Sequence, residues 1–173
     1  MRSCMESILT RVSVKKYKSD MPERKDIDKI IEAGIAAASG RNMQASVIVA
    51  VTNKEIRDRL SRDNAAVMGA SRDPFYNAPC VLVVLAEKTA HTYVYDGSLT
   101  LGNMMLAAHD LGLGSCWIHR AKEVMAKPEW VEWIKSLGLE GEYEGIGNLV
   151  VGYPDGELPP VKERKAGRIV YVD

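Results

Sequence analysis

The chain has 173 residues, 46% hydrophobic and 27% charged, which is the composition of a globular protein of one domain. Basic and acidic side chains number 23 each, so the chain lacks the basic surplus that a general nucleic-acid-binding protein needs. No apolar run is long enough to predict a membrane span, and the first residues lack the apolar stretch of a secretory signal.

The first half of the chain predicts both helices and strands, from the spacing of its apolar residues and the turn residues between them. In chain order these are a helix at 3–11, a helix from Pro22 to Ser39, a strand at 47–51, a surface helix at 53–64, a loop at 73–79 and a buried strand at 80–86. The strand at 47–51 is a continuous apolar run, which predicts a central strand covered on both faces.

The second half opens with the longest predicted helix, at 93–113, which is apolar on more than one side and is expected in the core. It is followed by a strand at 115–118, a helix at 121–137 interrupted at Pro128, a strand at 146–153 and a strand-like tail at 167–173. The strands do not alternate with single helices. The pattern therefore predicts an α+β fold, a mixed three-layer α/β/α sandwich over residues 1–173, rather than a doubly wound sheet.

The C-terminal arm, residues 160–173, is set apart by Pro159 and Pro160 and by its charged side chains. We expect its strand to add to the sheet edge of a second subunit, which would cover that edge and tie two chains together. Pairing within the same chain, or fraying as termini often do, is the alternative.

One candidate binding cluster follows the first helix. In an extended segment Arg11, Ser13 and Lys15 point to one side and present a guanidinium, a hydroxyl and an ammonium together. Such a set suits a phosphate or the polar edge of a flavin ring. A solvated basic face is the plainer alternative, since Lys16 and Lys18 are nearby.

Two further clusters lie elsewhere in the chain. Residues 39–44 join a helix end to a strand, and their hydroxyl and amide groups suit ring carbonyls and nitrogens. An ordinary turn explains them equally. Lys162 and Arg164 follow the proline pair and could bind a phosphate, or could belong to a solvated basic turn.

The sequence does not predict a dinucleotide-binding loop, a metal site or a nucleophilic cysteine. Residues 112–118 contain glycines but follow a helix and lack the spacing of a dinucleotide-binding loop. Cys4, Cys80 and Cys116 are widely spaced, which indicates reduced thiols in a cytoplasm, and the dispersed histidines predict no metal site. Cys116 and His119 are expected on opposite faces of an extended stretch, so a nucleophilic cysteine is not predicted.

Taken in order, several segments resemble the FMN-dependent nitroreductase family. The matching segments are 11–17, 38–44, 73–79, 96–108, 111–118, 150–154 and 162–165. The sequence departs from the family pattern at Lys15, which replaces an arginine, at Ala38, which replaces a proline, and at Ala45 and Ser46, which replace Pro-Trp.

The resemblance implies a mainly antiparallel sheet, a C-terminal strand exchanged between subunits, and a homodimer with two FMN sites at its interface. One subunit would supply Arg11, Val12, Ser13, Lys15, Lys162 and Arg164, and the other Ser39, Gly40, Asn42 and Gln44. The backbone of Trp117, Ile118, His119 and Arg120 would lie along the flavin ring.

The implied activity is a cytoplasmic oxidoreductase with ping-pong kinetics. NADH or NADPH would reduce FMN by hydride transfer and leave, and a nitroaromatic, a quinone or another small acceptor would then be reduced. No side chain needs to act as acid or base in that scheme. Two alternatives share the fold: a flavin-binding or storage protein without turnover, and a flavin-remodelling or dehalogenating enzyme.

Overall fold

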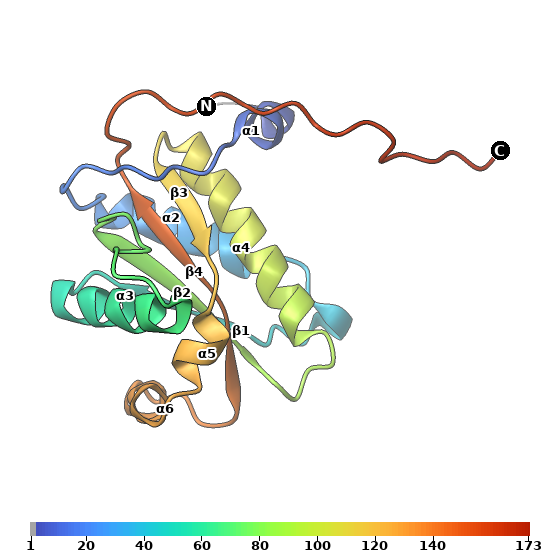
Figure 1. Cartoon of the computed structure of the whole chain (residues 1–173). Helices are drawn as coiled ribbons and strands as arrows, with labels where there is room; N and C mark the ends of the chain where they lie inside the picture. Colours follow the sequence, from blue (N-terminus) through green and yellow to red (C-terminus); the bar gives the residue numbers. More distant parts are fainter. Residues whose placement is uncertain (1–2) are drawn as a thin grey trace.

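The computed structural model describes residues 3–173 and shows a four-stranded sheet with helices on both faces (Figure 1). The helices are α1 (Cys4–Thr10), α2 (Arg24–Ile35), the 3-10 turn η1 (Gly40–Asn42), α3 (Lys54–Met68), α4 (Tyr93–Asp110), α5 (Ala121–Met125) and α6 (Pro128–Ser136). The strands are β1 (Ser46–Val51), β2 (Cys80–Glu87), β3 (Gly114–Ile118) and β4 (Tyr143–Gly152). The predicted three-layer α+β sandwich is confirmed.

The sheet has the order β1-β2-β4-β3, and every pair of neighbouring strands is antiparallel. Strands β2 and β4 lie in the centre and are buried almost throughout. The prediction that 47–51 forms a central strand is wrong, because β1 lies at one edge and is mostly half-buried. A continuous apolar run indicates a strand with apolar surroundings, but it does not indicate whether that strand has a neighbouring strand on each side.

Two hydrophobic cores form the layers on either side of the sheet. One is built with α3, α5 and α6 and contains Leu60, Met125 and the fully buried Trp130. The other is built with α2 and α4 and contains Ile30 and Met104. The predicted helix at 121–137 is two helices, because Pro128 starts α6. Proline is favoured at the first helical position, where a backbone N–H would have no acceptor within the helix. Helix α2 ends at Ile35, before the predicted stop at Ser39.

The C-terminal arm leaves the body of the molecule and forms no strand within the described residues of this single chain (Figure 1). Its apolar end is solvent-exposed, with Ile169 at 72% and Val172 at 94% exposure. Strand exchange between subunits therefore stays a prediction. No helix among residues 3–173 is both long and apolar enough to cross a membrane.

Candidate functional site

The segment after α1 lies along β3, and this fixes where its polar side chains point. The N–H of Val14 donates to the carbonyl of Ser115 at 3.0 Å, and Tyr17 Oη donates to the carbonyl of Val14 at 2.7 Å. Gly114 makes the close approach possible, because a Cβ there would lie 2.9 Å from Val14. Since Val14 is buried, its neighbours Ser13 and Lys15 face outward on the side predicted for them.

This segment and the start of the C-terminal arm enclose a cavity of about 530 Å³, here called the basic cavity. Its lining residues are Arg11, Val12, Ser13, Lys15, Pro159, Pro160, Val161, Lys162 and Arg164. Within the described part of the chain no acidic side chain lines it. The structure therefore brings the first and third sequence clusters together, with four cationic groups around one space that suits an anion.

Among the residues that line the basic cavity, Arg11 gives the most specific indication of the kind of ligand that would bind. Its Nη1 is buried and has no hydrogen-bond partner among residues 3–173. A buried polar group without a partner costs about 1–3 kcal/mol, and a charged one more. The guanidinium has only donors, so a ligand that relieves this cost must bring acceptor oxygens. A phosphate fits that requirement.

A second cavity, of about 380 Å³, shares Ser13 and Lys15 with the first and is here called the β3 cavity. It is lined by Trp117, Ile118, His119 and Arg120, the stretch that the family resemblance implies for a ring, and also by Met68, Arg72, Pro74, Tyr76 and Cys116. None of its lining residues in the described chain is acidic. Because they share these residues, the two cavities are adjacent. A molecule with an anionic tail and a planar ring could therefore occupy both.

The wall formed by Pro74 and Tyr76 is held by Asp73. This carboxylate accepts hydrogen bonds from Arg57 Nη2 at 2.6 Å, from the hydroxyl of Ser61, and from backbone N–H groups of Phe75 and Asn77. Burial alone would raise the pKa of Asp73, but these hydrogen bonds lower it below its usual value. The loop can therefore keep Tyr76 and Asn77 in the left-handed backbone region.

Cys116 and His119 both line the β3 cavity, contrary to the expectation that they lie on opposite faces. Strand β3 ends at Ile118, and the chain turns at Arg120, whose φ is 73°, so strand alternation no longer applies. Burial raises the pKa of the Cys116 thiol, although Ser13, Lys15 and Arg11 act in the opposite direction. A thiol that stays protonated is a poor nucleophile.

The polar loop, residues 39–44, is held by hydrogen bonds between its own residues. The hydroxyl of Ser39 accepts from the N–H of Gln44 at 3.0 Å, and Asn42 Oδ1 accepts from Gln44 Nε2 at 3.0 Å. Arg41, Asn42 and Gln44 all have positive φ. This concentration of strained backbone is typical of functional loops.

Gly40 ties the polar loop to the first turns of α4. Its N–H donates to Asp96 Oδ1 at 3.1 Å, and a Cβ at this position would lie only 2.2 Å from Thr92 Oγ1. The end of α1, just before Arg11, instead reaches the last turn of α4, where Thr10 Oγ1 lies 2.8 Å from His109 Nε2. At 1.5 Å per residue these contacts are about 20 Å apart along the helix axis. The polar loop lines neither the basic cavity nor the β3 cavity.

The comparison with known proteins identifies the family. The family model described as "Nitroreductase family" matches residues 8–70 and 62–153. The chain belongs to the nitroreductase family. A crystal structure of a nitroreductase with bound FMN from Bacteroides fragilis has a TM-score of 0.88 at 29% identity, with both chains covered completely.

Two more relatives of this nitroreductase family protein extend the comparison. A nitroreductase with bound FMN from Desulfitobacterium hafniense has a TM-score of 0.87 at 26% identity, again over the whole of both chains. The "NADPH-flavin oxidoreductase" of Vibrio harveyi is 28% identical over 181 aligned positions, covering 98% of this chain and 73% of that protein. The predicted resemblance is confirmed.

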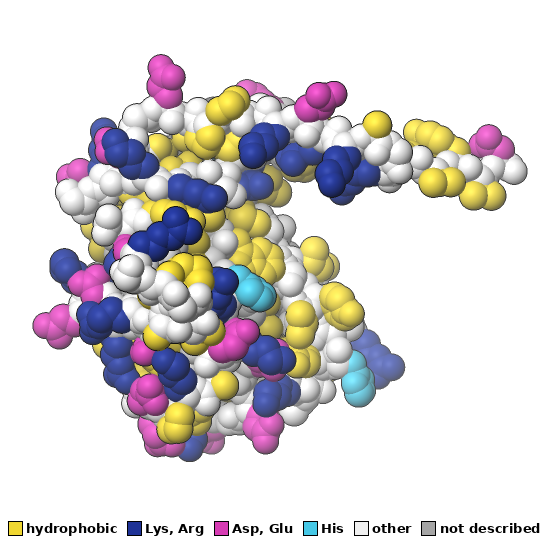
Figure 2. Space-filling view, in the orientation of Figure 1, with side chains coloured by type: hydrophobic (Ala, Val, Ile, Leu, Met, Phe, Trp, Pro, Cys, Tyr) yellow, Lys and Arg dark blue, Asp and Glu magenta, His cyan; other side chains and the backbone are white. Residues whose placement is uncertain are grey.

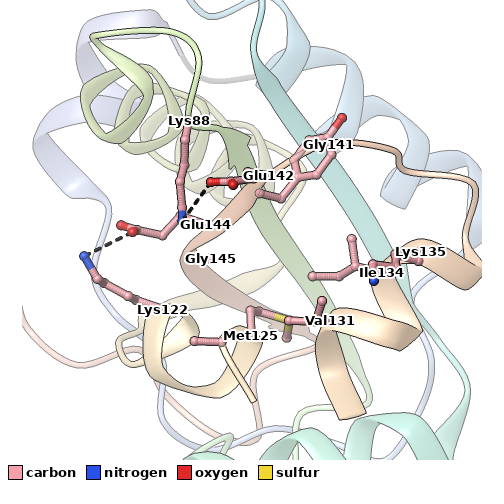
Figure 3. A pocket seen from close by; sticks show the side chains of 12 residues that line it. Lys88, Lys122, Met125, Val131, Ile134, Lys135, Gly141, Glu142, Glu144 and Gly145 are labelled. Atoms are coloured by element: carbon pink, nitrogen blue, oxygen red, sulfur yellow. Dashed lines mark ion pairs between the residues drawn. The ribbon is translucent and has the colours of Figure 1, made fainter. Parts of the chain in front are cut away.

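A third cavity, of about 490 Å³, lies between α5, α6 and the start of β4 (Figure 3). Its apolar side is formed by Met125, Val131 and Ile134. Its charged groups are paired, as Lys88 Nζ lies 3.6 Å from Glu142, Lys122 Nζ lies 3.1 Å from Glu144, and Lys135 Nζ lies 2.8 Å from Glu132 outside the cavity. This cavity therefore offers no unpaired charge to a ligand, and the site is better placed at the basic cavity and the β3 cavity. Residues 3–173 contain no group of three His, Cys, Asp or Glu side chains that could hold a metal.

Several residues of the β3 cavity were not predicted from the sequence. Arg72 and Tyr76 are the most notable, since Lys15 Nζ lies 5.9 Å from the centre of the Tyr76 ring. The loop at 73–79 matched the family pattern but was given no role. The one sequence feature that could have indicated a role is that this loop, with Pro74 and Pro79, leads directly into a buried strand.

Proposed function

We propose that the protein is an NAD(P)H-dependent FMN oxidoreductase that passes electrons to a small acceptor such as a nitroaromatic or a quinone. The B. fragilis and D. hafniense structures contain FMN, and the V. harveyi relative carries the name of an NADPH-flavin oxidoreductase. The proposal extends these properties to a family member whose two neighbouring cavities fit the two parts of FMN.

The observation that carries the proposal is that Arg11, which lines the basic cavity, has a buried Nη1 without a partner among residues 3–173. Arg11, Lys162 and Arg164 would hold the phosphate, and phosphate oxygens would supply the missing acceptors. Ser13 and Lys15 lie where the two cavities meet, and the backbone of 117–120 would run along the ring. Bound FMN supplies the hydride- and electron-transfer chemistry. The positive charge of Lys15 in the β3 cavity stabilises negative charge on whatever occupies it.

A homodimer completes the site in this proposal. The polar loop is held at the far end of α4, so Ser39, Gly40, Asn42 and Gln44 would serve the FMN site of the second subunit. Large hydrophobic side chains are exposed on α1, α2 and α4, among them Leu9, Ile35 and Tyr95, and a second copy would bury them. Figure 2 shows basic side chains along the first part of the C-terminal arm and hydrophobic ones near its end.

The arm would therefore have two roles in this proposal. Its cations would bind the phosphate, and its apolar end would pack against the second subunit. Such a strand could add to the half-buried edge strand β1, because the other edge strand, β3, already bonds to the segment after α1 through Val14 and Ser115. We further propose that residues 1–173 act as one domain and that the enzyme works in the cytoplasm. This location suits its reduced cysteines, which the structure leaves without disulfides.

The visible spectrum of the purified protein tests the proposal, recorded in the absence of oxygen before and after NADH or NADPH is added. We expect the bands of oxidised flavin, and we expect them to bleach with at least one of the two donors. Bands that persist would support a binding protein without turnover. A chemically altered flavin would support a remodelling enzyme. A colourless protein that takes up no added FMN would overturn the proposal.

A further inference from the structure

Asn64, near the end of α3, has an unusual combination of burial and hydrogen bonding. The residue is fully buried, and its Nδ2 donates to the carbonyl of His119 at 2.8 Å. Its Oδ1 is also buried but has no partner in the described chain. An amide that served packing alone would be replaced at little cost by an apolar side chain, because an unpaired buried oxygen is unfavourable.

The partner of this amide lies in the wall of the β3 cavity. His119 and Arg120 both line that cavity, in the two-residue connection between β3 and α5. Arg120 has a φ of 73° and begins α5 without a side-chain cap. A non-glycine residue in this conformation needs support from its surroundings. Asn64 supplies that support from α3, beside which the chain passes from β3 into α5 in Figure 1.

Fixing the carbonyl of His119 also fixes the N–H on the same peptide. The peptide between His119 and Arg120 is trans, as is every peptide bond in the described chain, so its C=O and N–H point in opposite directions. Since the C=O faces Asn64, the N–H of Arg120 is directed away from α3. That N–H has no backbone acceptor among residues 3–173 and is available to a ligand.

We propose that Asn64 is a positioning residue for the flavin site. It holds the His119–Arg120 peptide in the orientation that presents the N–H of Arg120 to a ring in the β3 cavity. Asn64 does not contact the ring itself and acts only through this peptide. The inference rests on the proposed FMN-dependent function, which gives the ring its identity.

The chain offers a matched control in Asn103 on α4. Its Nδ2 donates to the carbonyl of Ala33 at 3.1 Å, so it makes the same kind of bond away from both cavities. Asn64→Leu and Asn103→Leu each replace an amide by an apolar side chain with the same branching. Asn64→Ala is a second variant, which allows the proposal to be tested even if leucine is too large for the buried position and prevents folding.

FMN affinity and the spectrum of bound FMN are the first readouts. We expect Asn64→Leu and Asn64→Ala to raise the FMN dissociation constant about tenfold, the change that one lost hydrogen bond of ~1.4 kcal/mol produces. The visible absorption maxima of bound FMN should shift as well, which a purely structural role would not cause. Asn103→Leu should change the dissociation constant less than twofold and leave the maxima in place. Wild-type affinity and maxima in both Asn64 variants would overturn the proposal.

A measurement on the flavin-free protein separates this inference from the proposed function. The amide resonances of Arg120 and Ala121 should move in the Asn64 variants but not in Asn103→Leu. Unchanged resonances would show that Asn64 does not hold this peptide, whatever the protein binds. Wild-type protein that fails to bind FMN would refute the proposed function and the flavin role of Asn64, while the amide data would still report on the peptide.

Discussion

The basic cavity and the polar loop contain similar hydrogen-bonding groups but differ in how far the chain itself satisfies them. In the polar loop the hydroxyl of Ser39, Asn42 Oδ1, Gln44 Nε2 and the N–H of Gly40 all have partners within the chain. Around the basic cavity, Arg11 has a buried donor without a partner among residues 3–173, and four cations line the cavity with no described acid among the lining residues.

The difference shows what each region gains from a ligand. The basic cavity is electrostatically incomplete, so binding an anion there relieves repulsion and an unmade hydrogen bond. In the polar loop Ser39, Asn42 and Gln44 already bond within the single chain, and the strained backbone sets the positions of their side chains. We therefore expect changes in the basic cavity to act directly on affinity, and changes in the polar loop to act through the second subunit.

Removing the C-terminal arm should have the largest effect. Deletion of residues 161–173 removes Lys162 and Arg164 together with the apolar end, so we expect loss of bound FMN and a shift to monomer. Flavin absorbance and light scattering after size exclusion measure the two losses. Deletion of residues 169–173 alone keeps both cations and should weaken the dimer more than the phosphate contacts. A flavin-loaded dimer without residues 161–173 would rule out both roles of the arm.

Arg11→Ala should have the next largest effect. We expect FMN binding to weaken by about 1.5–3 kcal/mol, the range for a hydrogen bond to a charged group. Since the unpaired Nη1 is also removed, the flavin-free protein should be no less stable than wild type. Fluorescence titration with FMN and urea unfolding measure these quantities.

Lys16→Ala is the control for Arg11→Ala, because Lys16 pairs at the surface with Asp155 and lines neither cavity. It should leave FMN affinity unchanged. An Arg11→Ala protein with wild-type affinity would remove Arg11 from the site and with it the main support for the proposed function.

The sequence predicted the layers of the fold and the position of most strands, because continuous apolar runs bounded by turn residues are local signals. It also proposed Arg11 and Lys15 near one end of the chain, and Lys162 and Arg164 near the other, as candidate binding residues. Their meeting in one cavity could not be derived from spacing. It depends on how residues 11–15 lie along β3, which the close fit of Val14 against Gly114 decides.

The residues that sequence reasoning missed are positioned by non-local contacts. Arg72 and Tyr76 reach the β3 cavity because Asp73 collects hydrogen bonds from α3 and from its own loop. The edge position of β1 was missed for a related reason, since strand order is set by pairing across the sheet. Asn64 gave no signal at all, because its partner, the carbonyl of His119, is a backbone atom far away in the sequence.

Mixed dimers test whether the basic cavity and the polar loop of different subunits form one site. Arg11→Ala breaks the first region, and Gly40→Ala should displace the second, because its Cβ would meet Thr92 Oγ1 at 2.2 Å. Each homodimer should bind FMN weakly. In a dimer with one subunit of each kind, one site has both defects and the other has none, so we expect half of the wild-type flavin content.

Co-expression with two different affinity tags yields such mixed dimers, and absorbance gives flavin per dimer. Gly102→Ala is the control for the glycine substitution, since a Cβ at Gly102 meets nothing within 4 Å. A mixed dimer that binds no more FMN than its parents would place both regions in the same subunit's site and contradict the comparison between them.

The smallest expected effect concerns Asp73, which holds the loop that forms one wall of the β3 cavity and has all of its hydrogen bonds to the chain itself. Its native pKa is lowered, so the ionised carboxylate stabilises the fold above the unfolded value of about 3.9, and this contribution is lost as pH falls through the native pKa. Asp73→Asn should therefore reduce the free energy of unfolding by about 1.5 kcal/mol at pH 7, and by progressively less below pH 4.

Urea unfolding at neutral and acidic pH measures this difference for Asp73→Asn. Asp28→Asn is the control, because the pair of Asp28 with Arg24 is exposed and should contribute little at any pH. A stability difference that stays constant down to pH 3 would show that the carboxylate charge is not what holds the loop. Because Asp73 binds chain atoms rather than ligand, its substitution should change FMN affinity far less than Arg11→Ala does, which is the contrast expected between a satisfied and an unsatisfied charge beside one site.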